Sequence, residues 1–435
     1  MDKDKIKRYI LDFQERTFPN LREREIKLKE SSKIQSLIGA RRVGKTHLLF
    51  NKLQKLIEEG VKKEQIIYLN FENPTLNNVL YNEVKEIIVL HWSIFPEVTK
   101  QKLYLFIDEP QAIDKWELAI RELHDDFNCH IFITGSSSKL LSKEIATSLR
   151  GRSIATLVLP LSFQEFLAFK DLQFDKEKIS SQTKAKLLHS FEDFMLFGGY
   201  PEVVLENDKI EKLKITKDYY DLTIYKDIID RYKVHNTQAI KWLINHLTNS
   251  IAKEFSVNKV FLDLKSKGIK LSKNTLYEYV SMLEDSFFIF LLRKLEHSSK
   301  KESLSIPKIY LNDVGFLNLF SVQDYGKRFE NILFLHLIRK KNKSPLMKIN
   351  YWKSADDKEV DFVVREGGKV DLAIQVCYSL SETKTYDREI KSLLSCMNEF
   401  KLKEGFVITG DIKKKEKIDG KTIEFIPLWE YLLNY

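Results

Sequence analysis

The chain has 435 residues, of which 43% are hydrophobic and 31% charged, with only 15 glycines and 9 prolines. That balance excludes a disordered, collagen-like or low-complexity chain and provides apolar material for about three domains. The formal net charge of +9 permits nucleic acid or an acidic membrane surface as a partner without requiring either.

The N-terminal stretch is charged and amphipathic and has no apolar segment of the kind found in signal peptides. The most apolar runs, Phe287–Leu292 and Leu103–Ile107, are far shorter than the roughly 20 residues that span a bilayer. Cysteines 129, 377 and 396 stand far apart and favour a reducing compartment over a disulfide framework. We therefore expect a cytoplasmic protein with no membrane partner.

Between residue 34 and about residue 169, short apolar runs alternate with helical patterns. The expected strands are KIQSLIG, IIYLNFE, LYLFIDE, HIFITG and IATLVLP, and the expected helices cover residues 46–60, 78–91, 116–125 and 139–149. Strands that are apolar on both faces and alternate with helices indicate a parallel sheet covered on both sides. The sequence thus predicts an α/β domain over residues 1–170.

The segment GARRVGKT fits the pattern G-x-x-x-x-G-K-[ST], and it follows an expected strand and opens an expected helix. The glycines let N–H groups point at phosphates, the lysine supplies a positive charge to the β- and γ-phosphates, and the threonine hydroxyl reaches Mg²⁺. The alternative is a glycine turn beside a solvated lysine. The expected nucleotide-contacting residues are Gly39, Ala40, Arg41, Arg42, Val43, Gly44, Lys45 and Thr46, with His47 directly after them.

The strand LYLFIDE delivers Asp108 and Glu109 at its C-terminal end, where ligands lie in open α/β sheets. We expect Asp108 to hold Mg²⁺ together with Thr46, and Glu109 to polarise the attacking water in ATP hydrolysis. Two acids after a strand also occur as a plain turn, and the phosphate loop earlier in the chain favours the nucleotide site. A GTPase would need N-K-x-D, and the run starting at Asn258 lacks the aspartate.

Four further polar residues lie at the end of one expected strand and just before the last one. Thr134 and Ser136 end HIFITGS and suit a γ-phosphate sensor or a water-holding role, although a Ser/Thr helix cap explains them as well. Arg150 and Arg152 stand just before the last strand. Either arginine could act as a finger toward a neighbouring subunit, and a surface ion pair accounts for them equally.

Together these segments resemble a known family. GARRVGKT, YLFIDEPQAIDKWELAIRELHD, FITGSSSKLL, LRGR…LPLSFQEF and FGGYPEVV are similar to an AAA-superfamily ATPase family of archaea and bacteria. The resemblance covers nearly the whole chain. It implies ATP binding, a winged-helix segment, and a C-terminal domain of unknown function that is restriction-endonuclease-like.

The middle of the chain is predicted to be helical. Residues 171–250 form a charged helical connector with one break at FGGYP, and residues 251–311 have the outline of a winged helix-turn-helix. Over residues 253–273, six lysines stand against two acids, which fits phosphate contacts but also a solvated protein-docking face. The expected DNA-contacting residues are Lys265, Lys267, Lys270, Lys273, Asn274 and Tyr277.

Residues 312–435 return to a mixed α/β pattern, with a hairpin-like pair of segments, YWKSADDKEVDFVV and KVDLAIQVCYS. The restriction-endonuclease resemblance implies that carboxylates hold a metal there while a lysine activates water. Glu330, Glu359 and Asp361 supply carboxylates, but Gln375 and Cys377 stand where an acid and a lysine are expected. We expect an inactive fold retained for binding.

The leading interpretation is an ATP-hydrolysing protein with Mg²⁺ as its cofactor, whose nucleotide state drives DNA binding. One alternative is an ATP-gated switch or scaffold that docks a protein partner, and a further one is an ATP-dependent nuclease. Strong salt dependence of duplex binding separates the first two. The sequence leaves open whether the chain forms a homo-oligomer.

Overall fold

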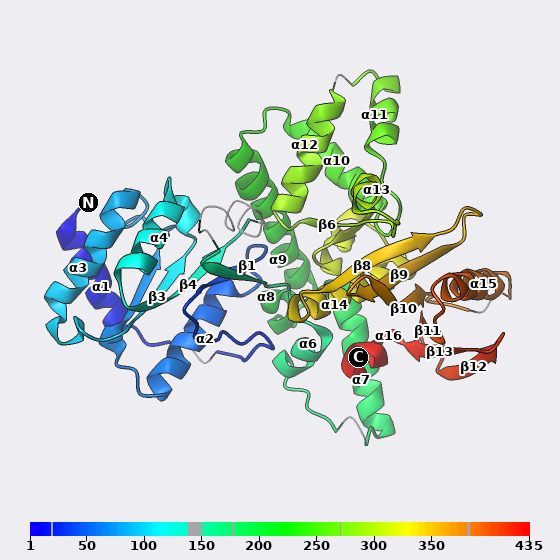
Figure 1. Cartoon of the computed structure of the whole chain (residues 1–435), viewed down its shortest axis with the longest axis horizontal. Coiled ribbons are helices and arrows are strands. Elements are labelled where there is room, and N and C mark those ends of the chain that lie inside the picture. The colour runs from blue at the N-terminus through cyan, green and yellow to red at the C-terminus, as the bar shows by residue number, and fades with distance from the viewer. Residues whose placement is uncertain (19–20, 138–148, 150, 176–177, 270, 381–382) are drawn as a thin grey trace. The chain divides into compact units, whose positions relative to one another are not determined.

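The computed structural model of the chain describes every residue except 19–20, 138–148, 150, 176–177, 270 and 381–382 (Figure 1). It divides into two compact units. The first unit comprises Met1–Val158 and Asp285–Phe287, and the second comprises Leu159–Glu284 and Phe288–Tyr435. The first unit ends before the domain boundary that we expected at residue 170. The segments predicted over residues 171–250, 251–311 and 312–435 lie almost entirely in the second unit.

The first unit is built on a five-stranded, fully parallel sheet with the strand order β2-β3-β4-β1-β5. Side chains on both faces of the central strands are buried, including Leu37, Leu105 and Phe132. The predicted parallel α/β class is therefore confirmed. The strands are β1 (Ile34–Ile38), β2 (Ile66–Asn70), β3 (Leu103–Asp108), β4 (Cys129–Gly135) and β5 (Ser153–Leu157).

The described helices of the first unit are α1 (Lys3–Glu15), α2 (Lys45–Glu58), α3 (Val84–Ile94) and α4 (Trp116–Asp126). The helix expected over residues 78–91 begins later than predicted, at Val84. The Glu83 carboxylate accepts the Leu80 N–H at 2.9 Å and caps a short 3-10 turn ahead of it. The helix expected over residues 139–149 lies outside the described residues, apart from its last position.

The second unit begins with helices that share one aromatic core. Phe163 packs edge-on against Phe191 with ring centroids 5.2 Å apart, and Phe166 packs against Phe194 at 5.4 Å. This packing places α6 in the second unit although it precedes residue 170. The helices before the expected winged-helix segment are α6 (Phe163–Phe169), α7 (Ser181–Phe197), α8 (Pro201–Leu205), α9 (Lys209–Leu222) and α10 (Thr237–Asn249), with a π-helical stretch at Thr223–Asp230.

A pair of glycines joins this helical region to the segment that follows β7. The Gly199 N–H donates to Asp313 Oδ2 at 2.7 Å, and its carbonyl accepts the Leu161 N–H at 2.7 Å. A Cβ on Gly199 would lie 2.4 Å from the Leu161 carbonyl oxygen. The glycine is needed because two other chain segments contact its backbone directly.

The predicted order of two helices and a hairpin is present between residues 251 and 311. Its elements are α11 (Val257–Ser266), α12 (Lys273–Asp285), β6 (Ile289–Leu292), α13 (Ser299–Leu304) and β7 (Lys308–Leu311), with β6 and β7 antiparallel. The Thr275 N–H donates to Ser272 Oγ at 3.0 Å, which caps α12. Leu276, Val280 and Leu283 are buried, as their helical spacing predicts.

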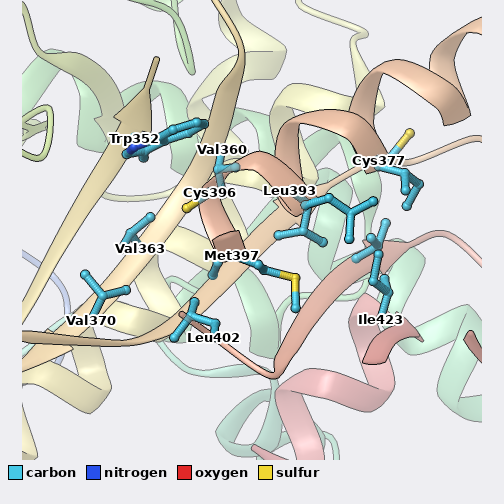
Figure 2. Close-up of a cluster of buried hydrophobic side chains, with 14 of the residues drawn as sticks. Trp352, Val360, Val363, Val370, Cys377, Leu393, Cys396, Met397, Leu402 and Ile423 are labelled. Atoms are coloured by element: carbon cyan, nitrogen blue, oxygen red, sulfur yellow. The ribbon is translucent and has the colours of Figure 1, made fainter. Parts of the chain in front are cut away.

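The C-terminal part holds a six-stranded mixed sheet with the order β12-β13-β11-β10-β9-β8. Strands β8, β9 and β10 pair antiparallel, whereas β10-β11 and β11-β13 pair parallel. Residues from α15 and the sheet, including Leu393, Met397 and Val363, form its buried core (Figure 2). The elements are α14 (Tyr325–Lys343), β8 (Met347–Lys353), β9 (Glu359–Glu366), β10 (Lys369–Val376), α15 (Thr383–Glu399), β11 (Glu404–Thr409), β12 (Lys414–Ile418), β13 (Lys421–Pro427) and α16 (Leu428–Asn434).

None of the helices in the described part of the chain has the length and apolar character needed to cross a bilayer.

Candidate nucleotide site

The phosphate loop joins the end of β1 to the start of α2. Gly44 has φ of 95° at the N-cap of α2, a left-handed backbone that favours glycine. A Cβ on Gly39 would lie 2.1 Å from the Val158 carbonyl oxygen, so the loop passes against the chain that leaves β5. Both glycines of the sequence pattern therefore meet a local geometric requirement.

Lys45 lies at the first position of α2, and its side chain is buried. Its ammonium group donates to the Gly39 and Ala40 carbonyl oxygens at 3.0 and 2.9 Å. The same group lies 3.6 Å from Glu109 Oε1. A lysine folded over its own loop in this way presents one positive charge at the helix N-terminus, where backbone N–H groups favour anions.

Asp108, the last residue of β3, is the centre of a buried hydrogen-bond network. Its Oδ2 accepts the Thr46 hydroxyl at 2.8 Å and the Tyr68 hydroxyl at 2.9 Å, and its Oδ1 accepts the Thr134 hydroxyl. Burial raises the pKa of Asp108, and the neighbouring Glu109 charge acts in the same direction, while these three hydrogen bonds oppose the rise. The network fixes the carboxylate beside the phosphate loop.

Glu109 directly follows β3 and has φ of 50°, which is unusual for a residue other than glycine. Its N–H donates to Thr134 Oγ1 at 3.1 Å, and its carboxylate accepts from the Gln111 side chain. Burial alone would raise the pKa of this carboxyl, but the charges of Lys45 and Arg41, with hydrogen bonds from Gln111 and Ser136, bring it below its ordinary value. Glu109 is therefore ionised at neutral pH, the state that a general base needs.

The other residues of the loop take different positions. Ala40 and Val43 are buried, and the Val43 carbonyl accepts from Arg24 Nη1 at 2.8 Å. Arg41 pairs with Glu72 at 2.8 Å. Arg42 and His47 have exposed side chains.

Thr134 and Ser136 are fully buried. Thr134 contacts both acids of the site, and Ser136 forms a hydrogen bond with Glu109. The alternative explanation for these two residues, a helix cap, would involve residues 138–148, which lie outside the described residues.

Arg150 lies outside the described residues as well. Arg152 donates to both carboxylate oxygens of Asp125, at 2.8 and 3.0 Å, which is the surface ion pair that the sequence left open. The arginine-finger role stays a prediction.

The expected DNA-contacting residues lie around α11 and α12 in the second unit. Lys265, Lys267, Asn274 and Tyr277 are exposed, and Lys270 lies outside the described residues. Lys267 forms an ion pair with Asp263 at 2.8 Å, and the half-buried Lys273 places its ammonium group 5.8 Å from the centre of the Tyr277 ring.

The C-terminal candidate residues are engaged by their neighbours. Gln375 donates to Glu389 of α15, and the Cys377 thiol donates to the Ser379 carbonyl oxygen at 3.1 Å. Burial raises the pKa of Cys377 to about 11, so the thiol carries no charge at neutral pH. Within the described residues, no group of three or more His, Cys, Asp or Glu side chains is arranged to hold a metal ion.

The nucleotide-site residues fit Mg²⁺ by their chemistry. A threonine hydroxyl and a carboxylate, 2.8 Å apart at the carboxyl end of a parallel sheet, are the hard oxygen ligands that Mg²⁺ prefers. Thr46 and Asp108 would hold it.

Comparison with known proteins places this geometry in a family. Residues 31–167 match the family described as an AAA domain. Residues 188–325 match a domain of unknown function (DUF8612), and residues 325–431 match another (DUF4143). An uncharacterized protein of Methanocaldococcus jannaschii is 39% identical, with 95% of this chain and 91% of that protein covered. The chain belongs to this family of AAA-domain P-loop proteins.

A second relative, an uncharacterized protein of Haemophilus influenzae, is 28% identical over 93% of this chain and 96% of its own length. Among solved structures, the Aeropyrum pernix ORC1 protein in complex with DNA covers 73% of this chain and 91% of that chain, at 10% identity and a TM-score of 0.30. That likeness is too low to support an argument about function.

Sequence reasoning did not find two residues of the AAA-domain site. Tyr68 donates to Asp108 from the neighbouring strand, where Tyr68 pairs in register with Phe106. Its hydroxyl in the otherwise apolar run IIYL was the available signal. Gln111 contacts Glu109 from the short 3-10 turn that follows β3, and its place in the run DEPQ was the only sign of a role.

Proposed function

We propose that the chain binds and hydrolyses ATP, with Mg²⁺ as cofactor, and couples its nucleotide state to DNA binding. The observation that carries the ATPase assignment is the hydrogen bond from the Thr46 hydroxyl to Asp108, at 2.8 Å. It brings the last residue of the phosphate loop and the acid of β3 to one point beside the Lys45 ammonium group. P-loop NTPases use this arrangement to hold phosphates and a metal ion.

Each residue has a separate task in this proposal. Lys45 turns its ammonium group from the loop carbonyls toward the phosphates, and the N-terminus of α2 adds backbone N–H donors. Bound Mg²⁺ supplies neutralisation of the charge that develops on the transferred phosphoryl group. Glu109, which is ionised and oriented by Gln111, accepts the proton of the attacking water.

The test separates binding from turnover. Lys45→Ala should abolish tight nucleotide binding, whereas Glu109→Gln should keep binding and lose hydrolysis, because the two residues act on different steps. Lys55→Ala is a matched control, since Lys55 lies on the same helix and pairs with Glu23 at the surface. Nucleotide binding is measured by calorimetry and turnover by phosphate release. Hydrolysis at the parental rate in Glu109→Gln would show that the base is another residue.

The DNA part of the proposal is supported by the exposed side chains of α11 and α12. Lys265 and Lys267 leave the end of α11, and Asn274 and Tyr277 lie on the side of α12 opposite its buried residues. A helix with one buried face and one exposed polar face, beside a basic turn, is suited to a groove flanked by phosphates.

Replacing Lys265, Lys267 and Lys270 by glutamine should weaken duplex binding and flatten its salt slope by up to about three units. ATP hydrolysis without DNA should stay near normal, since these lysines are not part of the AAA domain. Replacing Lys413, Lys414 and Lys415 by glutamine is the control, because it removes three lysines around β12 instead. The affinity for duplex DNA and its salt slope are measured by titrations at several salt concentrations. Unchanged values would show that this segment does not contact DNA.

One observation favours the protein-docking alternative. Leu262, Ile269 and Tyr277 are 62%, 38% and 50% exposed on the same segment. Exposed apolar side chains can pack against the apolar surface of a protein partner, whereas they form no favourable contact with phosphates. Under this alternative, Leu262→Ser should abolish partner binding, whereas the lysine replacements should not.

A further inference from the structure

A cleft of about 630 Å³ lies within the second unit and is lined by residues of α7, of the start of α14 and of the loops that follow β10 and β11. Its volume is in the range of small-molecule sites. The lining residues of α7 lie in the segment that matches DUF8612, and those of the two loops lie in the segment that matches DUF4143. The cleft is thus built where two sequence families meet inside one compact unit, and ligand sites are common at such junctions.

Aromatic side chains form one wall of the cleft. The Tyr325 and Tyr378 rings stack with their centroids 5.3 Å apart, and Phe329 packs edge-on against Tyr378 at 4.9 Å. Phe191 packs edge-on against Phe329 at 5.8 Å and continues the wall onto α7. Tyr325 and Tyr378 are nevertheless 40% and 42% exposed, so a ligand in the cleft can reach both rings. The faces of such rings attract cations.

The charge of the cleft differs from that of the whole chain. Among the described residues that line it, the charged side chains are both acidic, Glu192 of α7 and Asp411 of the loop after β11. Both are exposed, and neither carboxylate has a hydrogen-bond or ion-pair partner among the described residues. The chain as a whole has a formal net charge of +9. An acidic lining in this setting repels phosphates and favours a cationic ligand.

The cleft also offers aliphatic surface, because Leu188 and Ile412 lie among its lining residues. We propose that it binds an aliphatic polyamine. The ammonium groups of the ligand pair with Glu192 and Asp411 and lie against the tyrosine rings, while its methylene segments pack on the aliphatic side chains. A metal ion would gain nothing from the apolar part of the cleft, and a neutral apolar ligand would cover the two carboxylates without pairing them. The site is separate from the ATPase and DNA proposal.

Spermidine is the probe, and its binding to the nucleotide-free, full-length chain is measured by isothermal titration calorimetry. We expect one saturable site per chain. Glu192→Gln combined with Asp411→Asn should weaken spermidine binding by about tenfold, because two exposed ion pairs of modest strength are lost. Asp12→Asn combined with Asp218→Asn is the control, since it removes the same charge from exposed positions on α1 and α9 and should bind spermidine as the parent does.

The aromatic wall is tested separately. Tyr325→Leu should weaken spermidine binding by about threefold, whereas Tyr325→Phe keeps the ring and should bind as the parent does. The double carboxylate variant keeps the test valid where Tyr325→Leu destabilises the chain, because it alters only exposed side chains without partners among the described residues. Absence of saturable spermidine binding by the parent would overturn the proposal. Equal affinities of the parent and the double carboxylate variant, or equal weakening in the Asp12 and Asp218 control, would also overturn it.

Discussion

At the scale of single residues, the candidate site depends on hydrogen bonds to two adjacent acids. Burial raises the pKa of both Asp108 and Glu109 and prevails at Asp108, whereas at Glu109 two positive charges and two hydrogen bonds together outweigh it. Thr134 connects them, because its hydroxyl donates to Asp108 and accepts the Glu109 N–H. These opposite shifts support the different tasks that we propose for the two acids, one beside a cation and one as a base.

Tyr68→Phe should raise the Mg²⁺ concentration needed for half-maximal ATP turnover by about tenfold. A hydrogen bond to a charged group contributes about 1.5 kcal/mol or more, and the Tyr68 hydroxyl donates one to Asp108. Its loss raises the pKa of Asp108 further, so that protons compete more strongly with Mg²⁺ for the carboxylate. Tyr104→Phe in the adjacent strand is the control, because its hydroxyl lies near Glu30. A Mg²⁺ dependence identical to the parent's would contradict the assignment of Asp108.

His336 on α14 predicts a pH dependence of stability. Burial, together with the charges of Arg339, Lys340 and Lys343, lowers its pKa to about 3 in the folded chain. The pKa of an unfolded histidine is about 6.5, so its contribution to stability is present above that pH and is lost as the pH falls below it.

His336→Gln should therefore unfold with a weaker pH dependence than the parent. Between pH 7 and pH 5 the parent should lose about 2 kcal/mol more of its free energy of unfolding than the variant. Denaturant titrations at the two pH values measure the difference. His189→Gln on α7, which removes an exposed histidine, should behave as the parent does.

At the scale of elements, apolar patterning identified the strands of the AAA domain, because central parallel strands are buried on both faces. The same reasoning failed where a local hydrogen bond or a turn decides the structure. The expected wing between β6 and β7 contains the short helix α13, capped by the Ser298 hydroxyl, which accepts the Lys301 N–H at 3.2 Å. A side-chain cap of this kind involves only three or four residues, so it is hard to recognise in a stretch of sequence that is polar throughout.

Gly199→Ala tests whether the backbone contacts of Gly199 with Leu161 and Asp313 stabilise the second unit. The added methyl group would lie 2.4 Å from the Leu161 carbonyl oxygen, so the hydrogen bond between Leu161 and Gly199 must open. We expect a loss of about 3 kcal/mol in the free energy of unfolding of this unit. Gly326→Ala is the matched control, because the nearest atom lies 3.3 Å from its added Cβ and belongs to the Asp324 side chain. Equal stability of the two variants would refute this role of the glycine pair.

At the scale of the whole molecule, the sequence predicted the sheet of the AAA domain and the residues that meet at its carboxyl end, because the phosphate-loop pattern is local. It did not reveal what surrounds the C-terminal acids. Glu330, Glu359 and Asp361 were recognised as carboxylates, but Lys308, whose ammonium nitrogen lies 3.1, 2.7 and 2.8 Å from them, belongs to a different predicted domain. Contacts between residues far apart in the chain depend on tertiary packing, which a single sequence does not display.

These contacts bear on the nuclease alternative. With Mg²⁺ or Mn²⁺ the purified chain should leave supercoiled plasmid DNA intact. Lys308 occupies the centre of the acids, and neither the Gln375 amide nor the uncharged Cys377 thiol can replace an acid and an ammonium group in activating water. Agarose gels of the nicked and linear forms provide the measurement. Nicking by the parent that disappears in Asp361→Ala would identify the C-terminal domain as a nuclease.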